Sequence, residues 1–393
     1  MPPFFLRFLA AHSLLIGLLP FFLPVWLWQR GMDISGLCVL IGVSGLAFCV
    51  SLSAWQHVST HHSLNYLVVL TFALEILLLI TVLLTSSSAL PAAGLMLPLL
   101  IGIGNGIYNA FFWTTQRTLF VQSMGNNDTG RRYGNFQIVV GAFLKIGILA
   151  GGWLLDLGGL MWLLLISVLV ASAAAFWLAR QPPQPLQQES GTRWSCSLKF
   201  QDKQGSHTVF RIDGFFLYLE SHFWTVSLFL LVREDFSRLG IVVVVLAIVF
   251  ALLFWLLKNS IDQWAGNRIF TLAVSLYAFS WVLRAFLENS MTPFWLFVNL
   301  VIITFCSSFF RLTFNKRFFE NARDYGAVRY LLNKSYVSQW WLGIGFLATG
   351  LILSQIKLDS NSALAYSYWL AAVGSFAYLF YRKTYLPANS PSP

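Results

Sequence analysis

The chain has 393 residues, of which 57% are hydrophobic and only 10% are charged, and its formal net charge is +10. A soluble domain carries about 25% charged residues and could not keep this much apolar surface from water. The composition therefore excludes a soluble protein and indicates a polytopic membrane protein. The positive charge needs no nucleic-acid partner, because topology and contact with anionic lipid headgroups account for it.

Twelve stretches of the sequence are long enough to cross a hydrocarbon core of about 30 Å, which takes about 20 apolar residues per helix. The alternation typical of barrel strands is absent, so we expect an all-α integral membrane protein. No small-residue cleavage site follows the first stretch, which we expect to be an uncleaved helix. The expected spans are 4–28, 34–55, 64–86, 92–116, 133–156, 159–179, 212–232, 237–257, 269–289, 293–314, 330–354 and 363–381.

The lysines and arginines predict the orientation of these spans. With the N-terminus inside, most of the 25 basic residues fall in cytoplasmic segments, among them Arg117, Lys258 and Arg382. This bias follows the positive-inside rule. We therefore expect a multi-pass protein of a bacterial-type inner (plasma) membrane, with both termini in the cytoplasm.

One long polar segment interrupts the series of apolar spans. Residues Gln181 to His207 begin with closely spaced prolines, which are followed by glutamine, glutamate, serine and glycine. This is the composition of a linker, and it lies between the sixth and seventh expected helices. We expect an N-terminal six-helix bundle over 1–180, a cytoplasmic linker over 181–207 and a C-terminal six-helix bundle over 208–393.

The two halves share a local pattern. Phe111-Phe112 and Phe309-Phe310 each lie in an apolar segment that runs into a basic loop, and a second apolar segment with glycines follows each loop. The loops read Arg131-Arg132-Tyr133-Gly134 and Arg323-Asp324-Tyr325-Gly326. Duplicated halves in a membrane protein are typical of transporters that rock one half against the other.

Twelve helices arranged as six plus six, a central cytoplasmic linker and duplicated halves resemble the major facilitator superfamily. That superfamily carries a loop with an aspartate and an arginine between helices two and three, often echoed between helices eight and nine. The stretch Asp262 to Arg268 resembles this loop in the second place, whereas Gln56 to Ser63 in the first place has neither an acid nor an arginine. The resemblance implies alternating access to a site between the halves, with helices one, four, seven and ten around the cavity. The expected gating-loop residues are Arg131, Arg132, Asp262, Arg268 and Arg323.

Four ionisable residues stand near the centres of expected helices, where each costs a few kcal/mol and is a functional candidate. Glu75, Glu220 and His222 are candidates for a coupled proton, because carboxyl and imidazole groups can gain and lose protons in a partly dry cavity. Structural hydrogen bonding is the alternative for each. Lys145 either meets an anionic substrate or forms a structural ion pair.

Glu220 is the favoured proton carrier of this set. On α-helical spacing Glu220 and His222 point about 200° apart, so they are not expected to share one cavity wall. Lys145 is the expected partner of Glu220 in its ionised state. We expect Glu220→Gln to keep substrate exchange and to abolish accumulation driven by a pH gradient.

Polar side chains also follow two helices that the resemblance places around the cavity, at close to helical spacing. Such stripes either contact substrate or hold neighbouring helices together at about 1 kcal/mol per contact. Arg311, near the expected cytoplasmic mouth, either gates or attracts an anion or simply follows the topology rule. With Lys145, the substrate-binding candidates are Asn105, Tyr108, Asn109, Gln116, Tyr218, Asn299 and Arg311.

Motifs for chemistry are missing from the sequence. No phosphate-binding loop is present, which argues against an ATP-driven pump, and there is no convincing Ser/His/Asp set. His57 and His61 are four residues apart, yet no nearby acid or cysteine completes a metal site. We therefore expect neither an enzyme nor a cofactor or metal.

Two classes of function remain open. The first is a secondary active transporter, a symporter or antiporter that moves a small anionic or zwitterionic organic solute with protons by alternating access. The second is a transporter-derived receptor or assembly factor without net transport. The expected partners are a small-molecule substrate, protons and membrane lipids, and the expected state is a monomer.

Overall fold

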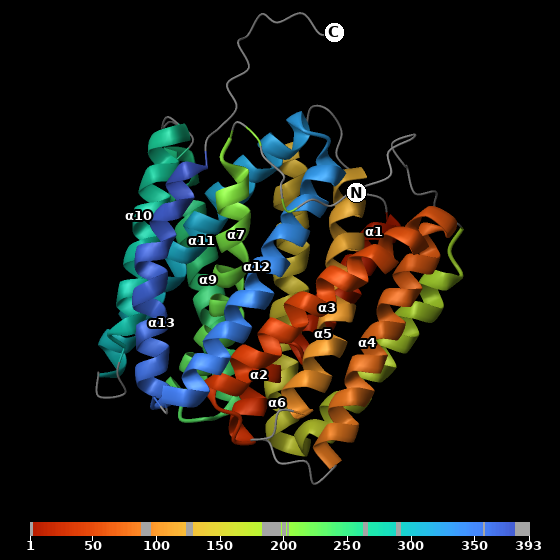
Figure 1. The fold of residues 1–393 in the computed structure, drawn as a ribbon, viewed down its shortest axis with the longest axis horizontal. Helices are drawn as coiled ribbons and strands as arrows, with labels where there is room; N and C mark the ends of the chain where they lie inside the picture. Colours follow the sequence, from red (N-terminus) through yellow and green to blue (C-terminus); the bar gives the residue numbers. More distant parts are fainter. Residues whose placement is uncertain are drawn as a thin grey trace, which may run out of the picture. The chain divides into compact units, whose positions relative to one another are not determined.

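The structure, a computed structural model, describes residues 3–87, 96–122, 129–182, 198, 202, 204–261, 266–287, 292–356 and 358–381. Within these residues every regular element is a helix (Figure 1), which confirms the predicted all-α class. Most of the predicted linker over 181–207 falls outside the described residues.

The first part of the chain forms six helices. The predicted span 4–28 is wrong in one respect, because it consists of two helices with a turn between them. Pro20 and Pro24 explain the break, since a proline lacks the N–H that a helix interior needs and is tolerated in a first turn. Pro24 lies in the first turn of the second helix. The helices are α1 (Pro3–Leu18), α2 (Leu23–Gln29), α3 (Ile34–His61), α4 (Leu64–Ser87), α5 (Met96–Gln122) and α6 (Thr129–Ala179).

Helix α6 joins the two stretches that the sequence predicts as separate spans, 133–156 and 159–179. Gly159 lies between them with φ 66° and ψ −171°, a backbone conformation that glycine adopts readily and that interrupts the helix. The element therefore consists of two helical arms that meet at Gly159, at the boundary that the sequence predicts.

The second part of the chain begins with a membrane span of mixed helical type. A single π-helical turn, η1, separates α7 from α8, so this predicted span is not α-helical throughout. At the other end of this part, the Ser362 N–H donates to the carboxylate of Asp359 at the start of α13, which lowers the pKa of Asp359. The elements are α7 (Ser206–Tyr218), η1 (Leu219–Phe223), α8 (Trp224–Leu231), α9 (Phe236–Ile261), α10 (Gly266–Ala285), α11 (Pro293–Asp324), α12 (Ala327–Ile356), α13 (Ser360–Gly374) and the 3-10 turn η2 (Ser375–Phe380).

Eleven helical stretches of the described chain are long and apolar enough to cross a membrane. This number treats α1–α2, α7–η1–α8 and α13–η2 as one span each, and it also treats α6 as one. Because α6 has two arms, the described helices correspond one by one to the twelve predicted spans.

The chain divides into two compact units. Unit 1 comprises Met1–Ser195, Gly214–Ala247 and Gln339–Leu364, and unit 2 comprises Cys196–Asp213, Ile248–Ser338 and Ala365–Pro393. In unit 1, α1 packs against α6, α3 against α5, and α4 against both α5 and α6 (Figure 1). In unit 2, α10 packs against α11 and η2. The predicted division into two six-helix bundles stays a prediction.

Glycines set the closest helix contacts of unit 1. Gly17 of α1 and Gly147 of α6 each lie against the backbone of the other helix, so that a side chain at either position would collide with it. Small residues permit this approach between membrane helices, where packing rather than the hydrophobic effect drives association. Gly147 thus allows α6 to approach α1 closely, whereas a side chain at Gly141 would meet open space.

Unit 1 also brings segments from early and late in the sequence together. A Cβ atom at Gly42 of α3 would lie 2.8 Å from the Leu347 nitrogen of α12, and the Ser35 hydroxyl donates to the Gly350 carbonyl over 2.8 Å. In a second such contact, the Ser237 N–H at the start of α9 donates to Asp156 of α6 over 2.7 Å. Helices α3 and α12 therefore touch backbone to backbone. Helices α6 and α9 do so as well, because a Cβ atom at Gly152 would lie 2.6 Å from the Phe236 carbonyl oxygen.

Candidate functional site

An acid with two basic partners lies within unit 2. Arg311 Nη1 of α11 donates to Asp213 Oδ1 of α7 over 2.8 Å, and Lys334 Nζ of α12 lies 2.6 Å from Asp213 Oδ2. The Tyr378 hydroxyl donates to the same Oδ1 over 2.8 Å. Asp213 is 1% exposed, Lys334 9% and Arg311 18%. We call Asp213, Arg311, Lys334 and Tyr378 the charged cluster.

Aromatic rings surround the charged cluster. Arg311 Nη2 lies 3.4 Å from the Tyr277 hydroxyl, and the Tyr277 ring stacks on Phe310 with centroids 4.1 Å apart. Lys334 Nζ lies 5.5 Å from the centroid of the Phe318 ring. Because charges in such surroundings interact strongly, Asp213 holds both cations in place, and the part of Arg311 that stays exposed can reach a solute.

A row of hydrogen bonds runs through unit 1. Trp113 Nε1 donates to Asn109 Oδ1 over 3.0 Å, Asn109 Nδ2 donates to Asn105 Oδ1 over 2.9 Å, and Asn105 Nδ2 donates to Ser44 Oγ over 3.0 Å. The Tyr218 hydroxyl is within hydrogen-bonding reach of Ser44. We call these five side chains the polar row; it links α5, α3 and α7 and contains three of the predicted substrate-binding residues.

A third polar group lies deeper in unit 1. His12 Nε2 of α1 faces Glu75 Oε2 of α4 at 3.7 Å, and both side chains are almost fully buried. The Tyr108 hydroxyl of α5 lies 3.5 Å from His12 Nδ1 and is within reach of the Glu75 carboxyl group. Glu75 therefore has an imidazole and a phenol as neighbours, and Tyr108 belongs to this group rather than to the polar row.

Glu220 and His222 both lie in the π-helical turn η1. The angle of about 200° expected between them assumed an α-helix, and that assumption is wrong here. A π-turn widens the helix and occurs frequently at functional sites. His222 Nδ1 lies 2.9 Å from the Ser221 hydroxyl, and its ring lies 4.9 Å from that of Tyr218 at the end of the polar row.

Other predicted substrate-binding residues lie apart from these groups. Lys145 is partly buried in α6 and forms no ion pair or hydrogen bond with any residue that the structure describes, so its expected pairing with Glu220 is absent. Gln116 is buried in α5, one helical turn beyond Trp113. Asn299 of α11 donates to the Trp295 carbonyl of its own helix over 2.9 Å.

The basic residues predicted as gating-loop residues lie in helices, so their placement in loops is wrong. Arg131 and Arg132 fall in the first turns of α6, Arg323 falls in the last turn of α11, and Arg268 is exposed in the first turn of α10. Membrane helices extend past the apolar core into the headgroup region. A prediction from hydropathy ends each helix at the last apolar residues and therefore makes the helices too short. Asp262 lies outside the described residues.

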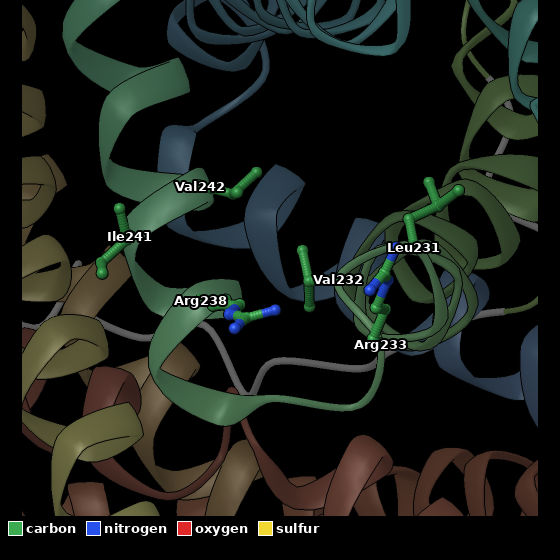
Figure 2. Close-up of a pocket in the computed structure, with 6 residues that line it drawn as sticks. All are labelled: Leu231, Val232, Arg233, Arg238, Ile241 and Val242. Carbon is green, nitrogen blue, oxygen red and sulfur yellow. The ribbon is translucent and has the colours of Figure 1, made fainter. Parts of the chain in front are cut away.

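A small pocket opens where α8 turns into α9 (Figure 2). It has a volume of about 240 Å³ and is lined by Leu231, Val232, Arg233, Arg238, Ile241 and Val242. In Figure 2, Arg233 and Arg238 lie on either side of Val232. Arg238 pairs with Asp235 at 3.1 Å, and both arginines are exposed. The pocket shares no residue with the three polar groups.

The sequence prediction misses several residues that the structure places in polar groups, above all His12, Asp213 and Lys334. His12 stands inside the first predicted span, so the cost of an ionisable group in a membrane could have revealed it. Asp213 and Lys334 stand at the edges of the spans predicted at 212–232 and 330–354. The longer helices of the structure place both well inside a span.

Comparison with known proteins shows which fold this is. No protein-family model matches the sequence, and no curated protein matches it. Among solved structures, the chain is similar to the nucleoside transporter NupG, with 14% identity and a TM-score of 0.68 over 96% of this chain and 98% of that chain. It is also similar to an auto-inhibited POT family peptide transporter, with 11% identity and a TM-score of 0.61 over 99% of this chain and 98% of that chain.

The class of the protein follows from these findings. The chain is a multi-pass membrane protein with the fold of the major facilitator superfamily, as the sequence resemblance predicts. At these identities the likeness concerns the fold.

Proposed function

We propose that this protein is a secondary active transporter that moves a small anionic or zwitterionic organic solute by alternating access, coupled to protons. The observation that carries the proposal is the charged cluster of unit 2, in which Arg311 and Lys334 share the single carboxylate of Asp213. Charged side chains inside membrane spans are costly and mark substrate or ion pathways.

The chemistry of the cluster supports an anionic group on the solute. Two cations meet one carboxylate, so a carboxylate or phosphate of the solute can complete the arrangement. Arg311 offers a planar guanidinium that suits a two-oxygen anion, and it is the most exposed member of the ion-paired set. A zwitterion also fits, because its amino group can approach the carboxylate of Asp213.

The polar row supports a solute with further hydrogen-bonding groups. Asn109 and Trp113 are both partly exposed, whereas Asn105 and Ser44 at the other end are buried. Asparagine carries a donor and an acceptor on one side chain, so Asn109 can bind a polar solute and still keep its bond to Asn105.

Helix contacts within unit 1 support movement. The contacts of α3 with α12 and of α6 with α9 join early and late parts of the sequence, and glycines line them. Backbone and small side chains make these contacts, so the helices can pack closely. They can also separate without first moving large side chains that would otherwise interdigitate. In the proposed cycle these two contacts open and close.

The sequence predicts three candidate residues for carrying the coupled proton: Glu75, Glu220 and His222. All three lie in membrane spans of unit 1. A carboxyl group that gains a proton becomes neutral and easier to move through apolar surroundings, so protonation can bias which state the protein adopts.

The similarity of fold to two transporters favours transport over the alternative of a receptor or assembly factor. Because fold alone does not determine function, binding should be tested before transport. Purified protein in detergent is heated with a panel that contains inorganic phosphate, mono- and dicarboxylates, amino acids and uncharged sugars. A ligand at 100 times its Kd stabilises the folded state by about 2.7 kcal/mol.

We expect one or more anionic or zwitterionic compounds to raise Tm in the wild type and not in Arg311→Gln or Lys334→Gln. Arg268→Gln, an exposed arginine outside the cluster, is the matched control and should keep the shift. The active compounds are then offered to proteoliposomes under an imposed pH gradient. Stabilisation by uncharged sugars alone contradicts the anionic preference, and binding without accumulation favours the receptor.

A further inference from the structure

Two buried polar atoms face each other in unit 1 without forming a hydrogen bond. His12 Nε2 and Glu75 Oε2 lie 3.7 Å apart, and neither atom has a hydrogen-bond partner among the described residues. The side chains are 0% and 2% exposed. Buried polar atoms are nearly always paired, so two facing atoms without partners indicate a site with a purpose other than packing.

The surroundings of this pair are aromatic. The imidazole of His12 stacks on Phe112, and it also contacts Phe8 edge-on and Phe72 face to face. These rings come from α5, α1 and α4, so they close around the pair from each helix that contributes to it. At 3.7 Å, no water fits on the line between the two polar atoms, so they face each other directly.

Few other charges face the pair. Tyr108 of α5 contacts both residues and is the one further titratable side chain in contact with them in the described part of the chain. Helix α6 packs against α1 and α4 and carries Lys145, which makes no ion pair or hydrogen bond within the described residues. The protonation state of the pair is therefore governed by His12 and Glu75 themselves.

Charge counting limits the states that the pair can adopt. With one proton, the pair is either a neutral imidazole beside a neutral carboxyl group or an imidazolium beside a carboxylate, and it has no net charge in both cases. Loss of this proton leaves a lone carboxylate among aromatic rings, and gain of a second leaves a lone imidazolium. Both charged states are strongly disfavoured in dry surroundings.

We propose that His12 and Glu75 form one proton-binding site, in which a single proton is shared between the imidazole Nε2 and the carboxyl Oε2. A shift of about 1 Å between α1 and α4 brings the two atoms within the hydrogen-bond range of roughly 2.7–3.2 Å. A shift in the opposite direction admits water and allows the proton to leave as hydronium. Proton occupancy and the position of α1 thus depend on each other.

The inference rests on the proposed function for the use of this proton, and it selects Glu75 among the three predicted carriers. Its test reads the proton directly and needs no substrate. Purified full-length protein in lipid nanodiscs is titrated with pH, and two signals are followed: the infrared carbonyl stretch of a protonated carboxyl group and the nitrogen-15 resonances of the histidine rings.

We expect one carboxyl band and one histidine resonance to change over the same pH range. Glu75→Gln should remove the band and shift the histidine step, and His12→Gln should remove the resonance and shift the carboxyl step by the same amount. Glu220→Gln and His222→Gln are matched controls and should leave both signals unchanged. Tyr108→Phe keeps the aromatic ring and removes only the hydroxyl, so the coupled titration step should persist in it. This variant tests the site without a substitution of His12, which could impair folding.

Independent titration of the two groups, or a carboxyl band that survives in Glu75→Gln, overturns the shared site. Neither result bears on transport. Conversely, if the coupled step is present and no compound accumulates under a pH gradient, the proposed transport function fails while the proton-binding site stands.

Discussion

At the scale of single residues, the charged cluster of unit 2 depends most on Asp213. It accepts a hydrogen bond from Arg311 and from Tyr378, and its other oxygen lies 2.6 Å from Lys334. A carboxylate can hold two cations in this way because it has about four lone-pair positions on two oxygens. Removal of its charge leaves two cations in the membrane span without their shared counter-charge.

We therefore expect Asp213→Asn to destabilise the protein by about 3–5 kcal/mol, the usual cost of breaking a buried ion pair from one side. The double variant Asp213→Asn/Lys334→Gln removes one cation as well and should recover part of the loss. Scanning fluorimetry of the purified proteins measures both. Equal Tm values for the single variant and the wild type contradict the structural role of Asp213.

Lys145 provides a second prediction at this scale. It is partly exposed in α6 and makes no ion pair within the described residues, so we expect its position to face water. Cys38, Cys49 and Cys306 are buried, and a variant with all native cysteines replaced by serine provides the background. In it, Lys145→Cys should react with a membrane-impermeant thiol reagent, whereas Ser167→Cys, 1% exposed in the second arm of α6, should not.

Residue types allowed part of these sites to be predicted. Asn105, Asn109 and Tyr218 were identified as candidates from their polarity inside apolar helices, and the structure joins them in one row. Ser44, the partner of Asn105 and Tyr218, carries no such signal, because a serine in a membrane helix commonly bonds to its own backbone. Which of several polar residues meet depends on helix packing that periodicity does not report.

At the scale of helices, the contact between α3 and α12 offers a direct test. A Cβ atom at Gly350 would lie 3.2 Å from Cys38 Cβ, close to the Cβ–Cβ separation of about 3.5–4.5 Å in disulfides. Gly350→Cys should thus form a disulfide with the native Cys38 under mild oxidation. Cleavage at a protease site inserted in the 181–207 segment should then leave the two fragments joined on a non-reducing gel.

The same variant with Cys38→Ser is the control and should fall into two fragments. In proteoliposomes, we expect oxidised Gly350→Cys to lose accumulation of the solute found by the binding screen and to regain it on reduction. Full accumulation in the oxidised protein contradicts the proposal that this contact opens in the cycle.

Spans were easier to predict than their interiors. Length and hydropathy located all the described membrane helices, because about 20 apolar residues per crossing is a strong constraint. The sequence predicts neither the turn between α1 and α2 nor the π-turn η1. Prolines at a helix centre do not always break it, and a π-turn differs from an α-turn by one residue, which leaves no mark in the composition.

At the scale of the whole molecule, the fold followed from the sequence through its composition, its duplicated pattern and its central linker. These features depend on many residues at once, so errors at single positions do not matter. The site is less predictable because it depends on which few ionisable side chains lie together. Arg311 was a candidate, yet Asp213 and Lys334, which define its surroundings, stood too near the predicted helix ends.

The orientation predicted from the basic residues can be measured on the intact protein. We expect a green fluorescent protein fused to the C-terminus to fluoresce and an alkaline phosphatase fused there to be inactive, because both termini are expected in the cytoplasm. The same reporters inserted between α12 and α13 should give the opposite pattern. Active phosphatase at the C-terminus contradicts the predicted orientation.

The polar row gives the molecule a built-in optical reporter. Each of its links from Trp113 to Ser44 runs in one direction, since every donor nitrogen points to the acceptor of the next residue. If Tyr218 moves away from Ser44, the polarisation of each hydrogen bond in the row changes, from Ser44 to the indole N–H of Trp113. The emission colour of Trp113, isolated by subtracting the spectrum of Trp113→Phe, should therefore reveal the position of α7 without any attached dye.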